Sequence, residues 1–304
     1  MNMKELVYPK EIAMMVYRDC QLNCKFCYTR GIDIDLNPKE LLNFYTNIIK
    51  SYEVDGHYPR IFIGGIGEPT LRRNYSILKK LLGRFPKNKF VLFSNLVEPK
   101  KTAKLVKEYP NLEKIIGRII SERGGDSYLE GKSRPSVEEI ICIFRKADVL
   151  DRLEFEILLL SSNLDKKFPR PLLDGHNIPY SYAGAVPLGR AIETGLYLSR
   201  EELIKQSQLK GSPKDFLGAI NCIIIEKGLT LLGLKVALCP GALVNEIYAK
   251  YPRKYAARLI NDKKELAKLC KITSDLIVMK RNKGISLTNM CIGREILYSK
   301  LEKR

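Results

Sequence analysis

The sequence predicts an α/β fold, a six-stranded partial (β/α) barrel followed by a smaller C-terminal α+β extension. Short apolar runs alternate with longer helix-periodic segments up to about residue 190, as βα units around a parallel sheet do. Glycine and proline mark most junctions between these segments. The chain has 304 residues, 45% of them hydrophobic, which is enough for one large domain and a smaller one.

Strands are expected where short runs of β-branched, aromatic or aliphatic residues are bounded by turn residues. The six expected strands are Ile12–Tyr17, Arg60–Ile63, Phe90–Phe93, Ile115–Ile120, Leu153–Leu159 and Tyr180–Ala185. Helices are expected between them, where apolar residues recur at every third or fourth position. The expected helices are Pro38–Ser51, Arg72–Leu82, Lys100–Glu108 and Val137–Ala147. Cys142 lies amid apolar neighbours in the last of these and is expected in the core.

The alternation stops near Gly195, so a domain boundary is expected at about residues 190–212. Residues 1–195 then form the core domain, and residues 196–304 form the extension. In the extension, Cys222–Leu238 is interpreted as a β-hairpin that turns at Lys227-Gly228. Helical patterns occupy Ser199–Gln208, Ala242–Ile260, Asp262–Cys270 and Cys291–Lys303.

The net charge of +18 is unevenly distributed along the chain. Between Arg72 and Lys107, eleven lysines and arginines face one acid, Glu98, and a second surplus runs from Lys250 to Arg304. Such surpluses favour anionic partners, including RNA, DNA and acidic peptides. The first surplus also fits helices whose outward faces need solvated charge, and no known nucleic-acid module accompanies it.

The compartment is predicted from the cysteines and from the N-terminal segment. Residues 1–19 carry charges throughout, and no run in the chain approaches the ~18 apolar residues of a membrane span. The eight cysteines fit a reducing compartment, where thiols serve metals or catalysis more often than disulfides. We therefore expect a cytoplasmic protein without a membrane partner.

The most informative motif is the C-x3-C-x2-C spacing of Cys20, Cys24 and Cys27, which follows the first expected strand. Three thiolates can each bind one iron of a [4Fe–4S] cluster, whereas an all-cysteine cluster needs a fourth. One iron is then open to a substrate or cofactor, as in catalytic metal sites. A zinc site is the alternative, but it requires a fourth ligand, and the only histidines, His57 and His176, are distant in sequence.

A second motif, Gly65-Ile66-Gly67-Glu68-Pro69-Thr70, follows the second expected strand. Glycines permit close backbone approach, and a carboxylate or its neighbouring carbonyls can accept hydrogen bonds from an ammonium group. Loops that follow the carboxyl ends of barrel strands meet at one face. The two motifs are therefore expected to share a site.

Together, the cysteine motif with Phe26 before its third cysteine and the G-x-G-E-P element resemble the radical S-adenosylmethionine (radical SAM) enzymes. The resemblance implies a six-stranded partial barrel in which S-adenosylmethionine chelates the open iron of the [4Fe–4S] cluster. It also implies reductive cleavage of that cofactor, a 5′-deoxyadenosyl radical, and an electron donor such as ferredoxin or flavodoxin. Phe26, Gly65, Gly67 and Glu68 are then expected at the cofactor.

Further cofactor contacts are expected from strand-end positions that are similar to those of the family. Ser94 and Asn95 end the third strand and Ser121 follows the fourth, although such polar residues also satisfy loop backbone. The run Tyr182–Ala185 resembles the segment against which adenine packs. The following Pro187–Ala191 is similar to the Pro-x-Gly-Arg-Ala run of peptide-modifying members.

Four late cysteines are candidates for an auxiliary iron–sulfur cluster, because four thiolates complete an all-cysteine cluster. They are Cys222, Cys239, Cys270 and Cys291. This part of the chain resembles the SPASM and Twitch extensions, but Gly233 is one residue too far from Cys239 and a later C-x2-C pair is missing. A structural zinc site and unligated buried thiols are the alternatives.

The leading functional hypothesis is a radical SAM enzyme that abstracts hydrogen from a peptide, protein or cofactor-precursor substrate. An alternative is the same chemistry on RNA or tRNA, motivated by the basic surplus. From another class, a non-catalytic zinc or iron–sulfur module that binds nucleic acid would use the same cysteines. The sequence assigns no substrate-specific catalytic residue.

Overall fold

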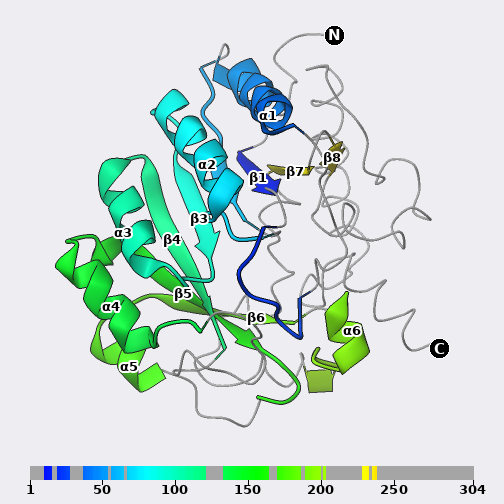
Figure 1. Ribbon diagram of the computed structural model, residues 1–304, viewed down its shortest axis with the longest axis vertical. Helices are drawn as coiled ribbons and strands as arrows, with labels where there is room; N and C mark the ends of the chain where they lie inside the picture. Colours follow the sequence, from blue (N-terminus) through cyan, green and yellow to red (C-terminus); the bar gives the residue numbers. More distant parts are fainter. Residues whose placement is uncertain are drawn as a thin grey trace, which may run out of the picture.

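The computed structural model describes part of the chain and places it around one eight-stranded sheet (Figure 1). The described residues are 10–15, 19–27, 37–53, 56–64, 67–120, 133–163, 170–185, 189–199, 201–202, 228–232 and 235–237. The order of the strands is β6-β5-β4-β3-β2-β1-β7-β8. Their bounds are β1 Glu11–Met15, β2 Arg60–Ile63, β3 Phe90–Ser94, β4 Leu112–Ile119, β5 Leu153–Leu159, β6 Tyr180–Gly184, β7 Gly228–Leu232 and β8 Lys235–Ala237.

The first six strands are parallel and curl into a half-barrel, which confirms the predicted partial (β/α) barrel. Each strand pairs with the next along the chain, so every connection crosses over through the helical layer. The carboxyl ends of all six strands therefore lie at one edge. This edge carries the loops that hold both sequence motifs.

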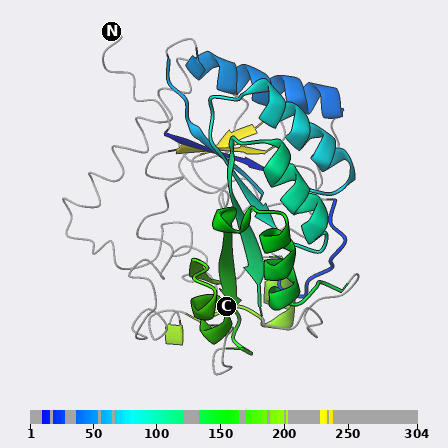
Figure 2. The same ribbon diagram turned by 90° about the vertical axis from the view of Figure 1, so that its left-hand side faces the viewer.

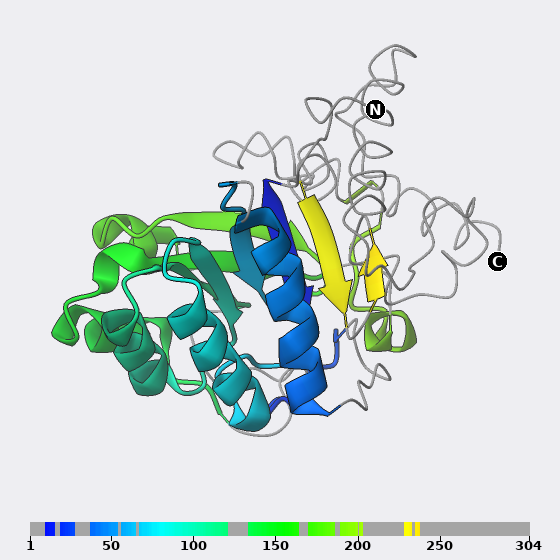
Figure 3. The same ribbon diagram turned by 90° about the horizontal axis from the view of Figure 1, so that it is seen from above.

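The predicted hairpin exists, but its turn was wrong. Gly228 is the first residue of β7 rather than part of a turn, and β7 pairs antiparallel with β8 across residues 233–234. β7 also pairs in parallel with β1, from Glu11 opposite Gly228 to Met15 opposite Leu232 (Figure 3). A Lys-Gly pair signals a turn only locally, and the long-range pairing with β1 draws this glycine into the sheet.

Helices α1 to α4 cover one face of the sheet (Figure 2). Their bounds are α1 Pro38–Glu53, α2 Arg72–Arg84, α3 Pro99–Glu108 and α4 Val137–Lys146. Two shorter helices, α5 Arg170–Gly175 and α6 Arg190–Thr194, and a 3₁₀ turn at Leu150–Arg152 lie further along the chain. The four long helices start and end within two residues of the predicted bounds.

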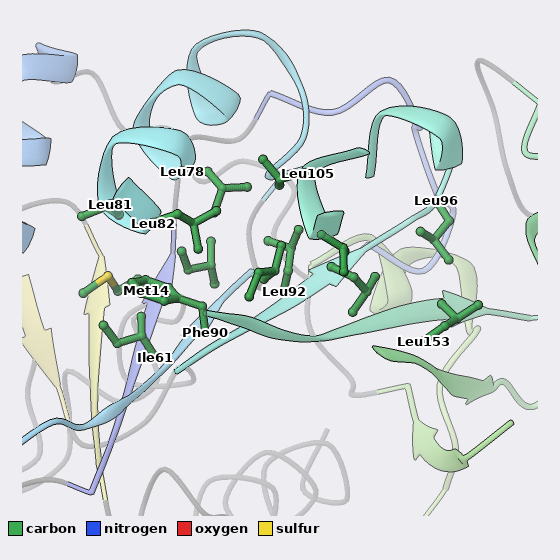
Figure 4. Close-up of a cluster of buried hydrophobic side chains, with 14 of the residues drawn as sticks. Met14, Ile61, Leu78, Leu81, Leu82, Phe90, Leu92, Leu96, Leu105 and Leu153 are labelled. Atoms are coloured by element: carbon green, nitrogen blue, oxygen red, sulfur yellow. The ribbon is translucent and has the colours of Figure 1, made fainter. Parts of the chain in front are cut away.

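The apolar core lies between these helices and the sheet (Figure 4). Leu78, Leu81 and Leu82 of α2 pack onto the layer that includes Ile61, Phe90 and Leu92, and all six are at most 1% exposed. Cys142 lies outside this core, which contradicts its predicted burial. The buried residues of α4 are Val137, Ile140, Ile141 and Phe144, and helical periodicity turns position 142 away from that face.

The opposite face of the sheet mixes charged and aromatic side chains. Ion pairs join neighbouring strands there, between Lys114 and Glu154 and between Arg118 and Glu156, and the Arg118 guanidinium lies 5.1 Å from the ring centroid of Phe93. The rings of Phe93 and Phe62 lie 6.4 Å apart on the same face. Among the described residues, ion pairs therefore occur on this face and not in the apolar core under the helices.

Candidate active site

The loop after β1 presents Cys20, Cys24 and Cys27 as free thiols near one another. The N–H of Cys27 donates to the carbonyl of Cys24 at 3.1 Å, and Cys20 Sγ accepts from the N–H of Leu22 at 3.4 Å. Burial, followed by repulsion from the other two thiolates, raises the pKa of Cys24 to about 12. Burial also raises the pKa of Cys20. A metal that binds these sulfurs must therefore displace their protons.

Groups from beyond β6 fasten the cysteine loop. The N–H of Arg190 donates to the carbonyl of Cys27 at 3.1 Å, and its Nη1 donates to the carbonyl of Asn23 at 3.0 Å. The hydroxyl of Thr194 donates to the carbonyl of Lys25 at 3.0 Å. The Gly-Arg-Ala run of the sequence thus lies against the cysteine loop, and α6 fixes the backbone of the motif.

Phe26 also anchors this loop. Its ring packs against a small apolar cluster of Ile120, Leu160 and Ala185, which lie at the ends of β4, β5 and β6. Burial of an aromatic ring contributes substantially to stability. The aromatic residue before the third cysteine therefore packs the loop onto the barrel edge.

Glu68 occupies the junction between the loops that follow β2 and β3. Its side chain is buried, and Oε1 accepts from the Thr70 N–H at 3.1 Å, the Thr70 hydroxyl at 2.6 Å and the Ser94 hydroxyl at 2.9 Å. Oε2 accepts from the Asn95 N–H at 2.7 Å. Burial raises the pKa of Glu68, and these four donors oppose that shift. The carboxylate therefore joins two loops.

Glycines make the β2 loop possible. Gly64 has a φ of +154°, and a Cβ on it would lie 2.7 Å from Cβ of Phe93, so only glycine fits. Gly67 has a φ of +67°, in the left-handed region. These conformations let the loop pass close to β3 before Glu68 enters its buried site.

The two motifs are in direct contact. The N–H of Glu68 donates to the carbonyl of Asp19 at 2.7 Å, and Nδ2 of Asn95 lies 3.6 Å from Sγ of Cys20. Arg73 adds an ion pair, with its Nε 3.1 Å from Oδ2 of Asp19. The predicted proximity of the cysteine and Glu68 loops is therefore found in the structure.

Arg134 is a site residue that the sequence analysis missed. It is 4% exposed, its Nη1 donates to the carbonyl of Arg118 at 2.7 Å, and its positive charge favours the thiolate of Cys24. It lies in the segment between β4 and α4, where nothing in the sequence distinguishes it from other arginines. Only the three-dimensional fold brings it near the cysteines.

Comparison with known proteins gives matches at the level of structure alone. No protein-family model matches the sequence, and no curated protein matches it significantly. SuiB of Streptococcus suis bound to S-adenosylmethionine superposes with a TM-score of 0.54 and 15% identity, over 79% of this chain and 63% of SuiB. The chain thus spans less than two thirds of that structure's length.

Two further structures support this comparison. The structure of anSMEcpe with bound AdoMet has a TM-score of 0.55 and 13% identity, over 87% of this chain and 84% of that protein. SuiB bound to its precursor peptide SuiA has a TM-score of 0.57 and 12% identity, over 89% and 68% of the two chains. SuiB and anSMEcpe both bind S-adenosylmethionine in these structures. The chain shares their fold, a partial (β/α) barrel of the radical SAM type.

The thiols of this core have the chemistry of cluster ligands. Cys20, Cys24 and Cys27 are free thiols on one loop, and a cubane cluster binds each of its cysteine sulfurs through a different iron. The donor set therefore fits a [4Fe–4S] cluster.

Several predicted site residues lie outside the described ranges. They are Gly65, Ser121, Cys222, Cys239, Cys270 and Cys291. The predicted helices after residue 240 and most of Ser199–Gln208 lie outside them as well. Within the described ranges, no helix combines the length and the apolar character that crossing a bilayer requires.

Proposed function

We propose that the chain is a radical SAM enzyme in which Cys20, Cys24 and Cys27 hold a [4Fe–4S] cluster with one iron open to S-adenosylmethionine. The observation that carries this proposal is the junction of the two motif loops, made by the 2.7 Å hydrogen bond from Glu68 to Asp19 and the Asn95 contact to Cys20. When bound, the cluster supplies the electron that splits the sulfonium cofactor and generates a carbon radical.

The surrounding side chains then act on the cluster ligands and on the loops. Asn95 presents an amide to the sulfur of Cys20, and hydrogen bonds to cluster sulfurs raise the reduction potential. Arg134 places a buried positive charge near Cys24, which favours the reduced, more negative cluster. Glu68 keeps the β2 and β3 loops at a fixed separation and does so from a buried position.

The proposed substrate is a peptide or a protein side chain. This proposal rests on the structural neighbours, because SuiB is bound to the precursor peptide SuiA and anSMEcpe to a Cp18Cys peptide. The Gly189-Arg190-Ala191 run, which is similar to that of peptide-modifying members, lies against the cysteine loop. An auxiliary cluster on the four late cysteines stays a prediction of the sequence.

The test is anaerobic reconstitution followed by metal analysis and an assay of cofactor cleavage. We expect about four irons and four sulfides per chain from the first cluster, and about twice that number if an auxiliary cluster is also present. We also expect the reconstituted protein to release 5′-deoxyadenosine when dithionite supplies the electron. Cys24→Ala should lower this release by more than about 10³-fold. The matched control is Cys142→Ala, which removes an exposed thiol from α4 and should leave release unchanged.

Two results would contradict the proposal. One is zinc without iron or sulfide in protein prepared without oxygen. The other is a fully iron-loaded protein that binds S-adenosylmethionine but releases no 5′-deoxyadenosine under strong reductant. A filter-binding assay with tRNA in the same preparation tests the alternative substrate class, because phosphate contacts make RNA affinity fall steeply with salt.

A further inference from the structure

Helices α2 and α3 carry an exposed basic face on the outside of the barrel. Figure 1 shows α2 and α3 as neighbours on the outer layer, and an ion pair between Lys79 and Glu108 at 2.7 Å links them. Exposed cations run over both helices and the loop that follows α2. They are Arg72, Arg73, Lys80, Arg84, Lys87, Lys89, Lys100, Lys104 and Lys107.

The charges at the start of these helices oppose helix stability. Arg72 and Arg73 begin α2, and Lys100 and Lys101 lie in the first turn of α3, where the helix dipole is positive. Neither first turn contains an acid, and neither N-cap side chain accepts a hydrogen bond. By contrast, α4 begins with Glu138 and Glu139 and a full capping box. Arg73 pairs with Asp19 at 3.1 Å, and Lys101 pairs with Glu98, the N-cap residue of α3, at 3.3 Å. Among the described residues no ion pair accounts for Arg72 or Lys100.

These four cations lie at the edge that carries the cysteine loop. Arg73 pairs with Asp19, the residue before Cys20, at 3.1 Å, and Nζ of Lys101 donates to the carbonyl of Thr70 in the Glu68 loop. We name Arg72, Arg73, Lys100 and Lys101, with Lys104 one turn further along α3, the basic edge. It is a positively charged surface that borders the cluster-binding loop from the helix side of the barrel.

We propose that the basic edge docks an acidic electron-carrier protein that delivers one electron to the cluster through the Cys20 side of its loop. This inference rests on the proposed function, since an electron must enter the cluster before the sulfonium cofactor is cleaved. With a flavodoxin as carrier, the anionic flavin hydroquinone gives up one electron and becomes the neutral semiquinone, and that electron reduces the oxidised cluster.

The charge pattern fits such a carrier. Redox encounters use small interfaces with fast exchange, and complementary charge raises their association rate rather than their lifetime. A compact patch of cations beside the redox centre is sufficient for that purpose. A nucleic-acid partner would contact the basic face along its whole length, because each phosphate contact adds a similar amount to the binding affinity wherever the cation lies. The two partners therefore predict different effects at the two ends of the helices.

The experiment compares two double variants with the same change in charge. Arg72→Glu with Lys100→Glu alters the basic edge, and Lys89→Glu with Lys107→Glu alters the far end of the same face. Neither pair includes Arg73 or Lys101, which contact the motif loops. Release of 5′-deoxyadenosine is measured with dithionite, with reduced flavodoxin and, separately, with reduced ferredoxin, at low and high salt.

We expect the basic-edge variant to lose about tenfold or more of its carrier-driven rate at low salt and to keep its dithionite-driven rate within about twofold. The far-end variant should keep both rates. A second readout needs no cluster: carbodiimide coupling of the carrier's carboxylates to cluster-free protein should map to Lys100 and Lys104 and omit Lys89 and Lys107. The carrier that gives both results identifies the partner.

The results that overturn this inference differ from those that overturn the proposed function. Normal carrier-driven rates and an unchanged cross-link at Lys104 in the basic-edge variant would overturn the docking site while leaving dithionite-driven cleavage intact. An equal loss of the carrier-driven rate in both double variants would also overturn the docking site. If the protein also bound tRNA with salt-sensitive affinity, the basic face would be assigned to RNA. Absence of dithionite-driven cleavage in the unaltered protein would instead contradict the proposed function itself.

Discussion

The helix-covered face of the sheet and the loops at its carboxyl edge are held by different forces. On the covered face, side chains such as Phe90, Leu92 and Phe144 are fully buried against one another. At the edge, hydrogen bonds from Asn95 to Glu68 and Cys20 and from Arg190 to the cysteine loop connect segments that are far apart in sequence. Apolar packing provides the stable frame, and directional polar contacts place the chemical groups. Substitutions in the two regions should therefore separate stability from chemistry.

The largest effect on stability is expected on the covered face. Phe144→Ala should lower the free energy of unfolding by about 3–5 kcal/mol, because it leaves a cavity beneath α4. Cofactor cleavage per folded, cluster-loaded molecule should be unchanged. Denaturant unfolding and the dithionite assay measure the two quantities. The control is Cys142→Ala, at an exposed position of the same helix. If Phe144→Ala lost as much cofactor cleavage as Cys24→Ala, stability and chemistry would not be separated between the two regions.

Glu68→Gln tests the junction, where the two regions meet. An amide cannot accept from all four donors, so the substitution should cost about 1–3 kcal/mol and weaken binding of S-adenosylmethionine by about tenfold. Thermal unfolding and equilibrium dialysis give these values. Glu138→Gln, at an exposed position on α4, removes the same charge; it should cost no more than about 1 kcal/mol, because the acid lies in a helix first turn, and should leave cofactor affinity unchanged. Unchanged cofactor affinity in Glu68→Gln would show that this carboxylate stabilises the fold and does not contribute to cofactor binding.

The pH dependence of stability, compared between the unaltered protein and Glu68→Gln, tests the role of burial at this junction. Because burial raises the folded-state pKa of Glu68 above its unfolded value, its contribution to stability is fully present below the unfolded pKa. That contribution is lost as pH rises through the folded pKa. The stability advantage of the unaltered protein over Glu68→Gln should therefore shrink as pH rises. An advantage that grows with pH would show that the four donors outweigh burial.

The smallest effect is expected at the start of α4. Ser136 and Glu139 form a capping box, with hydrogen bonds of 3.2 and 2.7 Å, so Ser136→Ala should cost about 1 kcal/mol. Arg134 lies two residues before this cap. The cofactor-cleavage rate of Ser136→Ala therefore shows whether the cap also holds the Arg134 guanidinium in place near Cys24. We expect an unchanged rate. Ser76→Ala, exposed in the middle of α2, should cause no loss of stability and serves as the control.

The covered face was largely predictable from the sequence, and the edge was predictable only in part. The bounds of β2 and β5 match the prediction because a short apolar run between turn residues is a local signal. Helix α6 has five residues, too few to show a period, and was not predicted. The parallel pairing of β7 with β1 joins residues more than 200 positions apart, which no local pattern encodes.

The site residues divide in the same way. Cys20, Cys24, Cys27 and Glu68 stood out because their spacing has chemical meaning, but the sequence did not reveal that the Glu68 carboxylate faces inward onto Thr70, Ser94 and Asn95. Burial is a property of the packed chain. The position of Arg134 depends likewise on how β4 ends, so it could not be inferred from its neighbours in sequence.

The attachment of the cysteine loop to α6 has a consequence for biosynthesis. Arg190 reaches the carbonyl of Asn23 across 167 positions, so the ribosome releases the cysteines long before it makes the residues that hold their loop. Domains fold during translation from the N-terminus onward. If the proposed cluster is present, its loading in the cell should follow completion of β6 and α6, and chains truncated before Arg190 should be recovered without iron.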